Sequence, residues 1–347
     1  MKKEKTCYTA IGGSALIEGV MMRSPEKTAI AVRRERGDIV LKVSKNKQPN
    51  KIIAKIPIIR GLVNFVASMK LSYSSMMYAA DVAMEEIEEE TPPETKMEKF
   101  LSKVFGKTGL AVLGVLAMVI GAVMGIGLFL GLPTLIVSFV TGMVPAYAQL
   151  SDGWQQLITS LGEGVIKMVV FLCYLLLISQ MKDIKRVFQY HGAEHKSIFC
   201  HEKGQELTPE NAAKFKRFHP RCGTSFLFLT LLVSIVISTL ITTGNVWLRA
   251  GLRICLLPVM MGLAYECIRL AGKYDNVLTR ILSAPGMWFQ RLTTKEPDKS
   301  QLEIAIAALN GVLKEYPLDQ DLILTEESYK LKEKNDESTT QTDSQEC

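Results

Sequence analysis

The chain has 347 residues, of which 48% are hydrophobic and 22% are charged, and its mean hydropathy is +0.17. This composition excludes a disordered chain, a collagen-like repeat and a disulfide scaffold. The formal net charge of +6 is too small to indicate that the chain binds nucleic acid. Seven cysteines, three of them inside apolar segments, indicate reduced thiols rather than a secreted disulfide framework.

Residues 1–56 predict a small α+β unit. Two β-prone runs, 28–34 and 39–43, flank Glu35-Arg36-Gly37-Asp38, which is a hairpin signal. A segment of helical periodicity follows at 57–84 and predicts an amphipathic helix that lies on the membrane or on the bundle. An acidic linker containing two prolines completes the region 57–108.

Residues 109–272 predict a membrane domain of four transmembrane helices. Each apolar segment is long enough to cross about 30 Å of hydrocarbon. The segments are 109–130, 162–180, 224–241 and about 252–271. Pro133 is expected to end the first span, and the apolar residues after it are expected to form an interfacial or re-entrant piece.

Basic residues are distributed unevenly between the loops. The connection 131–161 has no Lys or Arg, whereas the loop 181–223 holds nine. Because cytoplasmic loops carry an excess of Lys and Arg, we expect this loop and both termini to be cytoplasmic. The predicted location is therefore the cell membrane, with several passes through it.

The C-terminal part, 273–327, is predicted to be a short helical segment. Ala284-Pro285-Gly286 is expected to break the chain, and residues 302–313 have the spacing of an amphipathic helix that starts near 298–301. Residues 328–347 have the composition of a disordered tail. The predicted fold class is mainly α and integral to the membrane, with a small N-terminal α+β part.

All four histidines lie between residues 191 and 219. His191, Glu194 and His195 match the pattern H-x-x-E-H, in which two imidazoles one helical turn apart face the same metal. His219 and Cys222 follow, and imidazole and thiolate are both good zinc ligands. The sequence therefore favours a divalent metal, zinc above all, in this loop. The alternative is a loop whose histidines and lysines contact lipid headgroups or cap helices.

Glu266, near the end of the fourth predicted span, needs a partner inside the membrane. The sequence leaves two readings of it open, an ion pair with Arg269 and a fifth metal ligand. Cys200 and His201 are expected to be bystanders, because neither shares the helical face of His191 and His195.

The segment GGSALIEGVMMR (residues 12–23) has glycines on both sides of a short apolar run. Its spacing matches neither a dinucleotide fingerprint nor a Walker loop. It favours tight turns where the backbone approaches another part of the chain closely. A role for Glu18 or Arg23 at the cytoplasmic site is the alternative.

With these residues assembled, the chain resembles the YqhQ-like family of bacterial multi-pass membrane proteins, which are regarded as metal-dependent enzymes of unknown substrate. The resemblance rests on GGSALIEGVMMR (12–23), PIIRGLVNF (57–65), YHGAEHKSIFC (190–200), HPRCGTSF (219–226), AYE (264–266) and EPDKSQLEIAIAAL (296–309). It implies a bacterial membrane location and a metal group of His191, His195, His219 and Cys222, with Glu194 and Glu266 beside it.

Two main functions are consistent with this pattern. The first is a membrane-embedded hydrolase in which Glu194 is the general base and the substrate is membrane lipid or a membrane-associated molecule. The second is a non-catalytic protein in which a closed four-ligand zinc site staples the loop and the soluble parts recruit a partner. A transporter is less favoured, since four spans with one acid offer little pathway unless the protein forms a homo-oligomer. The sequence identifies no specific protein partner.

Overall fold

A computed structural model describes residues 11–46, 55–84, 116, 119–219, 222–241, 243, 245–273 and 277–324. The expected acidic linker, the start of the first expected span and the expected tail lie outside the described residues. The chain divides into two compact units, which are described separately. The sheet unit comprises Met1–Glu86, Ile178–Phe228 and Tyr265–Cys347, and the helical unit comprises Ile87–Leu177 and Leu229–Ala264.

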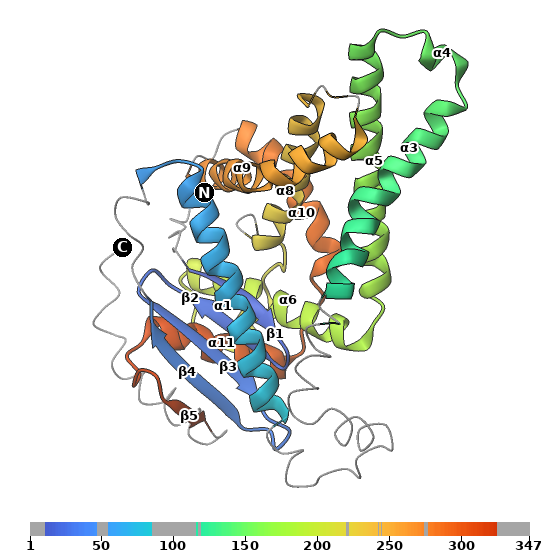
Figure 1. Cartoon of the computed structure of the whole chain (residues 1–347). Coiled ribbons are helices and arrows are strands. Elements are labelled where there is room, and N and C mark those ends of the chain that lie inside the picture. The colour runs from blue at the N-terminus through green and yellow to red at the C-terminus, as the bar shows by residue number, and fades with distance from the viewer. Residues whose placement is uncertain are drawn as a thin grey trace, which may run out of the picture. The chain divides into compact units, whose positions relative to one another are not determined.

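The sheet unit contains a five-stranded antiparallel sheet with strand order β1-β2-β3-β4-β5 (Figure 1). Its strands are β1 Gly12–Leu16, β2 Gly19–Arg23, β3 Lys27–Arg33, β4 Ile39–Lys45 and β5 Asp321–Leu324. The predicted hairpin is confirmed: Arg33 pairs with Ile39, and Gly37 supplies the positive φ of 94° in the turn between them. The segment 12–23 forms a second hairpin, so its glycine-rich pattern belongs to two short strands and a turn.

Helices cover both faces of this sheet (Figure 1). On one face, α1 (Ile59–Met84) buries Ala79 and Val82 against Leu16 and Val32. On the other face, α11 (Lys299–Leu313) buries its apolar side in the main core. The Asp298 side chain caps α11 and forms a capping box with Gln301, which explains why the helix begins where the sequence predicts.

The N- and C-terminal parts share one core. Seven hydrophobic side chains of α11 are at most 2% exposed, and they are Leu302, Ile304, Ala305, Ile306, Ala307, Ala308 and Leu309. They pack against inward-facing residues of β2, β3 and β4, while β5 adds a strand beside β4. The segments that the sequence analysis treats as separate, 1–56 and 273–327, therefore lie in a single unit, because neither buries its apolar face alone.

Three more helices belong to the sheet unit: α6 (Lys182–Glu202), α7 (Pro209–Ala213) and α10 (Val277–Thr293). The expected chain break at Ala284-Pro285-Gly286 is wrong, since α10 continues through Pro285. A proline inside a helix removes one backbone hydrogen bond, and this helix tolerates that loss. α6 packs against α11 and β1, with Tyr190 and Ala193 fully buried in the main core.

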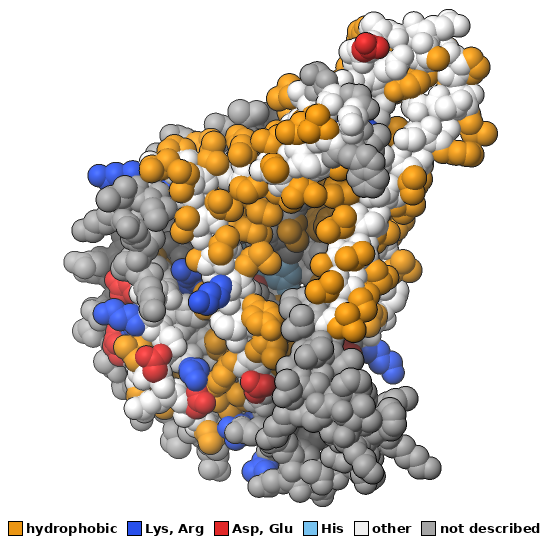
Figure 2. All heavy atoms as spheres, in the orientation of Figure 1, with side chains coloured by type: hydrophobic (Ala, Val, Ile, Leu, Met, Phe, Trp, Pro, Cys, Tyr) orange, Lys and Arg blue, Asp and Glu red, His pale blue; other side chains and the backbone are white. Residues whose placement is uncertain are grey.

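The helical unit has three helical segments that are long and apolar enough to cross a membrane. They are Val119–Gly142, Asp152–Ile178 and Leu248–Leu270, with mean hydropathies of 2.2, 2.1 and 1.5. The third predicted span appears as a shorter apolar helix, Phe226–Thr239, so three of the four expected spans meet this criterion among the described residues. Hydrophobic side chains are frequent on the visible face of these helices, with backbone and other side chains between them (Figure 2).

Among the described residues, five labelled α-helices and one π-helix lie wholly or partly in this unit. They are η2 (Gly127–Gly131), α3 (Leu132–Gly142), α4 (Pro145–Ala148), α5 (Asp152–Ile178), α8 (Gly223–Thr239) and α9 (Val246–Lys273). The expectation that Pro133 ends the first span is wrong, because the helix continues to Gly142. The missing N–H of Pro133 falls where the helix passes from π to α hydrogen bonding, so the chain loses little there.

Candidate metal centre

Three of the sequence-predicted ligands converge in the sheet unit. His191 and His195 lie one turn apart on α6, and Cys222 immediately precedes α8. The ligand atoms of these three side chains all lie within 4.8 Å of one another. His191 Nε2 is 3.1 Å from Cys222 Sγ, and the two imidazole rings are 4.5 Å apart between centroids. Two ligands of a tetrahedral zinc ion would lie about 3.5 Å apart, so this arrangement has the right size for a metal.

Backbone carbonyls orient both imidazoles. His191 Nδ1 donates to Thr293 O at 2.9 Å, and His195 Nδ1 donates to Arg217 O at 2.5 Å. A carbonyl oxygen only accepts, so each ring carries a proton on Nδ1, and in the neutral ring Nε2 is then the nitrogen with the lone pair. Hydrogen bonds of this kind hold metal-binding histidines in the correct tautomer. Burial also lowers the pKa of His195, which favours the neutral ring.

Two glycines let neighbouring backbone approach this site. A Cβ on Gly192 would lie 2.1 Å from Lys295 O, so the segment after α10 packs directly on α6. This contact brings Thr293 within reach of His191. A Cβ on Gly13 would lie 2.9 Å from the side chain of Glu194, and the Gly13 amide donates to the Glu194 carboxylate. The H-G-x-E-H spacing and the N-terminal glycines therefore serve the same site.

Glu194 is buried beside the three ligands. Its side chain faces His191 and His219, and burial raises its pKa above the usual value for a glutamate. Glu194 Oε2 is buried and has no hydrogen-bond partner among the described residues. A buried carboxylate oxygen without a partner is costly, so this atom marks a place where water or a ligand belongs.

His219 lies next to this group but faces a different partner. Its Nε2 is 3.6 Å from Glu202 Oε2, and its ring is 5.6 Å from that of His195 between centroids. Gln290 holds the His219 backbone with two hydrogen bonds of 2.7 Å, one to the N–H and one to the carbonyl. Among the described residues, the group of close ligand atoms thus has three members rather than the four expected.

Glu266 lies outside this group. It forms a two-pronged ion pair with Arg60 of α1, at 2.7 and 2.5 Å. Arg269 is more distant, at 4.0 Å, so the ion-pair reading holds with a partner that the sequence analysis did not name.

Two of the three ligands, His195 and Cys222, border a cavity of about 700 Å³ within the sheet unit. Its lining includes Gly13, Arg23, Ser68, Glu194, His195 and Cys222. Arg23 thus lines the same cavity as Glu194, and the role at the site that the alternative reading gives it stays a prediction. Glu18 instead occupies the β1–β2 turn with a φ of 50° and pairs with Arg186 of α6.

The expected bystanders have structural partners of their own. The Cys200 thiol donates to Glu206 O at 3.3 Å, and burial raises its pKa to about 11.

Sequence reasoning missed Gln290, Thr293 and Glu202, which orient the site residues. A backbone carbonyl leaves no sequence signal, and one glutamine in an apolar helix is too weak a signal to assign.

Comparison with known proteins gives a family without an activity. Residues 56–315 match the family model described as "Protein of unknown function (DUF1385)". The chain is 34% identical over 317 residues to the uncharacterized protein YqhQ of Bacillus subtilis (strain 168), covering 88% of this chain and 92% of that protein. No solved structure matches the chain. The chain therefore belongs to the DUF1385 family, in agreement with the YqhQ-like resemblance of its motifs.

Proposed function

We propose that this protein is a membrane-embedded, metal-dependent hydrolase whose metal is held by His191, His195 and Cys222. The observation that carries the proposal is the pair of imidazoles whose Nδ1 protons are committed to backbone carbonyls, so that both Nε2 atoms are directed to the thiol. Two nitrogens and one sulfur suit zinc better than magnesium or calcium, which prefer oxygen.

The number of ligands supports an open site. Structural zinc sites use four protein ligands, whereas catalytic sites use three and keep one position for water or substrate. His219 faces Glu202, and the three-membered group borders a cavity large enough for a substrate. These features favour the hydrolase over a closed zinc staple.

The residues around the ligands have separate roles in this proposal. When bound, the metal supplies Lewis-acid chemistry and lowers the pKa of water in the open position. Glu194 takes the proton from the attacking water, because its Oε2 is unpaired while the Gly13 amide orients the carboxylate. Arg23, on the cavity wall, binds an anionic group of the substrate.

Substrate access follows from the helices that are long enough to cross a membrane. The loop 181–223 carries nine basic residues, and the positive-inside rule supports a cytoplasmic location for the site and for both termini. The substrate is then membrane lipid or a membrane-associated molecule. It reaches the site from the bilayer surface.

Metal content tests the site directly. Full-length protein purified in detergent without chelators is expected to contain one zinc per chain, and Cys222→Ser and His191→Ala are expected to lose at least nine-tenths of it. His201→Ala is the matched control, since His201 lies on the same helix outside the group. Equal metal in all four proteins would overturn the proposal.

Activity separates the hydrolase from a structural zinc site. Glu194→Gln is expected to keep the metal and the melting temperature of the wild type. It is also expected to slow hydrolysis by about 10²-fold or more, measured over a panel of membrane-associated esters, phosphoesters and peptides. If wild type and Glu194→Gln hydrolyse every probe equally while both retain zinc, the metal is structural.

A further inference from the structure

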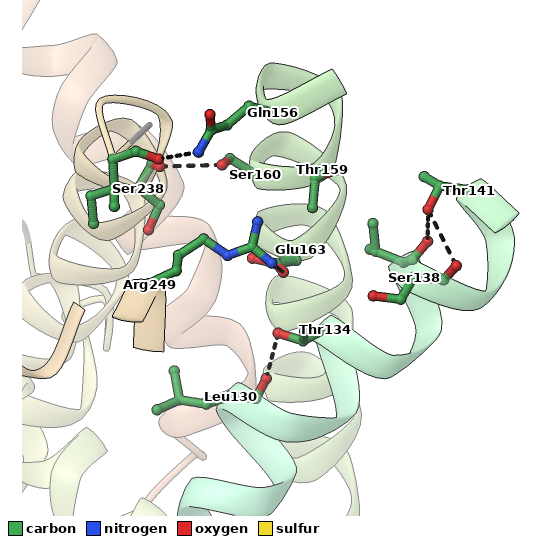
Figure 3. A network of polar contacts seen from close by, with 12 residues as sticks. Leu130, Thr134, Ser138, Thr141, Gln156, Thr159, Ser160, Glu163, Ser238 and Arg249 are labelled. Carbon is green, nitrogen blue, oxygen red and sulfur yellow. Dashed lines mark hydrogen bonds and ion pairs between the residues drawn. The ribbon is translucent and has the colours of Figure 1, made fainter. Parts of the chain in front are cut away.

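The helical unit contains polar side chains that the metal site does not use. On α3, Thr134, Ser138 and Thr141 are spaced three or four residues apart and so share one helical face (Figure 3). On α5 a second polar stripe shares a face, made of Gln156, Thr159, Ser160, Glu163 and Lys167. Such stripes are costly in helices that face lipid, and they usually mark a binding site or a pathway.

Glu163 of the α5 stripe belongs to a cluster of charged side chains. Glu163 is 2% exposed, and its two carboxylate oxygens are 3.2 Å from Arg249 and 2.5 Å from Arg253 (Figure 3 draws Glu163 and Arg249). Both arginine side chains are about nine-tenths buried. Arg253 Nε is buried without a hydrogen-bond partner among the described residues.

The cluster has more positive than negative charge. Arg249, Arg253 and Lys167, one turn after Glu163 on α5, give three positive charges against one carboxylate. A pair that only fastened two helices together would need a single arginine. Buried charge without a counter-charge is expensive, so the excess favours an anion as the missing component.

Arg249 also lines a cavity of about 670 Å³ inside the helical unit. Side chains that offer hydroxyl or amide groups share the wall, among them Ser138, Thr141, Gln156 and Thr159. One acid, Asp152, contributes to the lining at the start of α5, where it is exposed. Arg249 and Asp152 are the two charged residues of this lining, so the surplus positive charge comes from Arg253 and Lys167, which lie outside it.

Arg249 also lies in the first turn of α9. The N-terminus of a helix adds partial positive charge, which favours an anion there. Guanidinium groups bind phosphate in a two-pronged geometry.

We propose that this cavity of the helical unit is a binding site for a phosphate-bearing anion, with Arg249 as its contacting cation. Glu163 then has two roles, since it neutralises one arginine and leaves the second charge for the ligand. The site is independent of the metal centre and of the hydrolase proposal.

The test uses full-length protein in a neutral detergent. Binding of phosphatidylglycerol, phosphatidylcholine and inorganic phosphate is measured by native mass spectrometry and by the shift in melting temperature. We expect phosphatidylglycerol or phosphate to bind and to stabilise the wild type, while zwitterionic phosphatidylcholine has the smaller effect. Preference for phosphatidylglycerol assigns a lipid headgroup, and preference for phosphate assigns a soluble anion.

Two variants and one control locate the site. Arg249→Gln is expected to weaken binding of the preferred anion about tenfold or more, whereas Arg269→Gln, an exposed arginine on the same helix, should leave it unchanged. Glu163→Gln frees a second guanidinium, so this variant should bind the same anion about tenfold more tightly than the wild type. The anion should also raise the melting temperature of the variant more than it raises that of the wild type.

Three results would overturn the proposal. They are equal stabilisation by all three probes, equal anion binding by Arg249→Gln and Arg269→Gln, or a Glu163→Gln variant that binds the anion no more tightly than the wild type. Should Arg249→Gln fail to fold, the sign of the Glu163→Gln effect decides, because a purely structural ion cluster predicts no gain in affinity.

Discussion

The two units stabilise their buried polar groups in different ways. In the sheet unit, the Nδ1 atoms of the His191 and His195 imidazoles are tied to backbone carbonyls. In the helical unit, the Glu163 carboxylate is held between two guanidinium groups. The first arrangement directs lone pairs at one point and suits a cation, whereas the second has surplus positive charge and suits an anion. Two buried clusters with similar burial thus predict ligands of opposite sign.

The two clusters should also differ in how much free energy of unfolding is lost when one of their groups loses its partner. Neutral imidazoles lose hydrogen bonds when a neighbour moves, at a cost of about 1–3 kcal/mol for each buried group left unpaired. Charged groups lose far more when a partner is removed, because the remaining ion stays buried. Substitutions in the two clusters and in the residues around them measure this difference.

Glu163→Ala is expected to have the largest effect. It leaves Arg249 and Arg253 buried without their carboxylate, which should lower the free energy of unfolding by about 3–5 kcal/mol. Thermal unfolding in detergent measures the change. Asp152→Ala, which removes an exposed acid from the same helix, is the control and should change stability by less than about 0.5 kcal/mol. Equal losses in the two variants would mean that the cluster holds no buried charge.

Gly192→Ala should cost about 2–3 kcal/mol, because its Cβ would meet Lys295 O and push the segment 293–297 off α6. The same movement separates Thr293 from His191, so metal content should fall as well. Denaturant unfolding and elemental analysis measure the two effects. Gly153→Ala, a helical position with open space around it, should instead be neutral or slightly stabilising.

Gln290→Ala should cost about 2 kcal/mol, because it leaves the buried N–H and carbonyl of His219 without the side chain that pairs with both. Metal content should change little, since His219 lies outside the three-membered group. Lys185→Ala, at an exposed position on α6, is the control for stability. A complete loss of metal in Gln290→Ala would make His219 a ligand after all.

Glu18→Ala should have the smallest effect, below about 1 kcal/mol, because its ion pair with Arg186 is partly exposed to solvent. High salt should remove most of the difference from the wild type, since exposed ion pairs are screened. A large loss that persists in high salt would show that the β1–β2 turn itself depends on this contact.

Local patterns predicted the parts of the fold that depend on nearby residues. The hairpin around Gly37 and the helices α1 and α11 follow from turn chemistry, helical spacing and the cap at Asp298, and all are present. The four-residue strand β5 was missed because DLIL is too short to have a detectable period. Pro133 and Pro285 were predicted to end or break their segments, but both helices continue through them. Tertiary packing tolerates a proline at a position where the local sequence alone would disfavour a helix.

The candidate site divides in the same way. His191 and His195 were predicted from their spacing on one helix, and Cys222 joins them in the structure. The partner of Glu266 is Arg60, 206 positions away in sequence, and no local pattern connects the two. Glu163 was missed because one acid in an apolar helix has no meaning until Arg249 and Arg253 are seen beside it.

X-ray absorption at the zinc edge, on full-length protein in detergent, tests the central claim most directly. The account predicts two imidazole nitrogens at about 2.0–2.1 Å, one sulfur at about 2.3 Å and one oxygen from solvent in the first coordination shell. Cys222→Ser should lose the sulfur signal, whereas Cys200→Ser should keep it. A shell of three imidazoles and one sulfur with no solvent oxygen, or one without sulfur, would contradict the open three-ligand site.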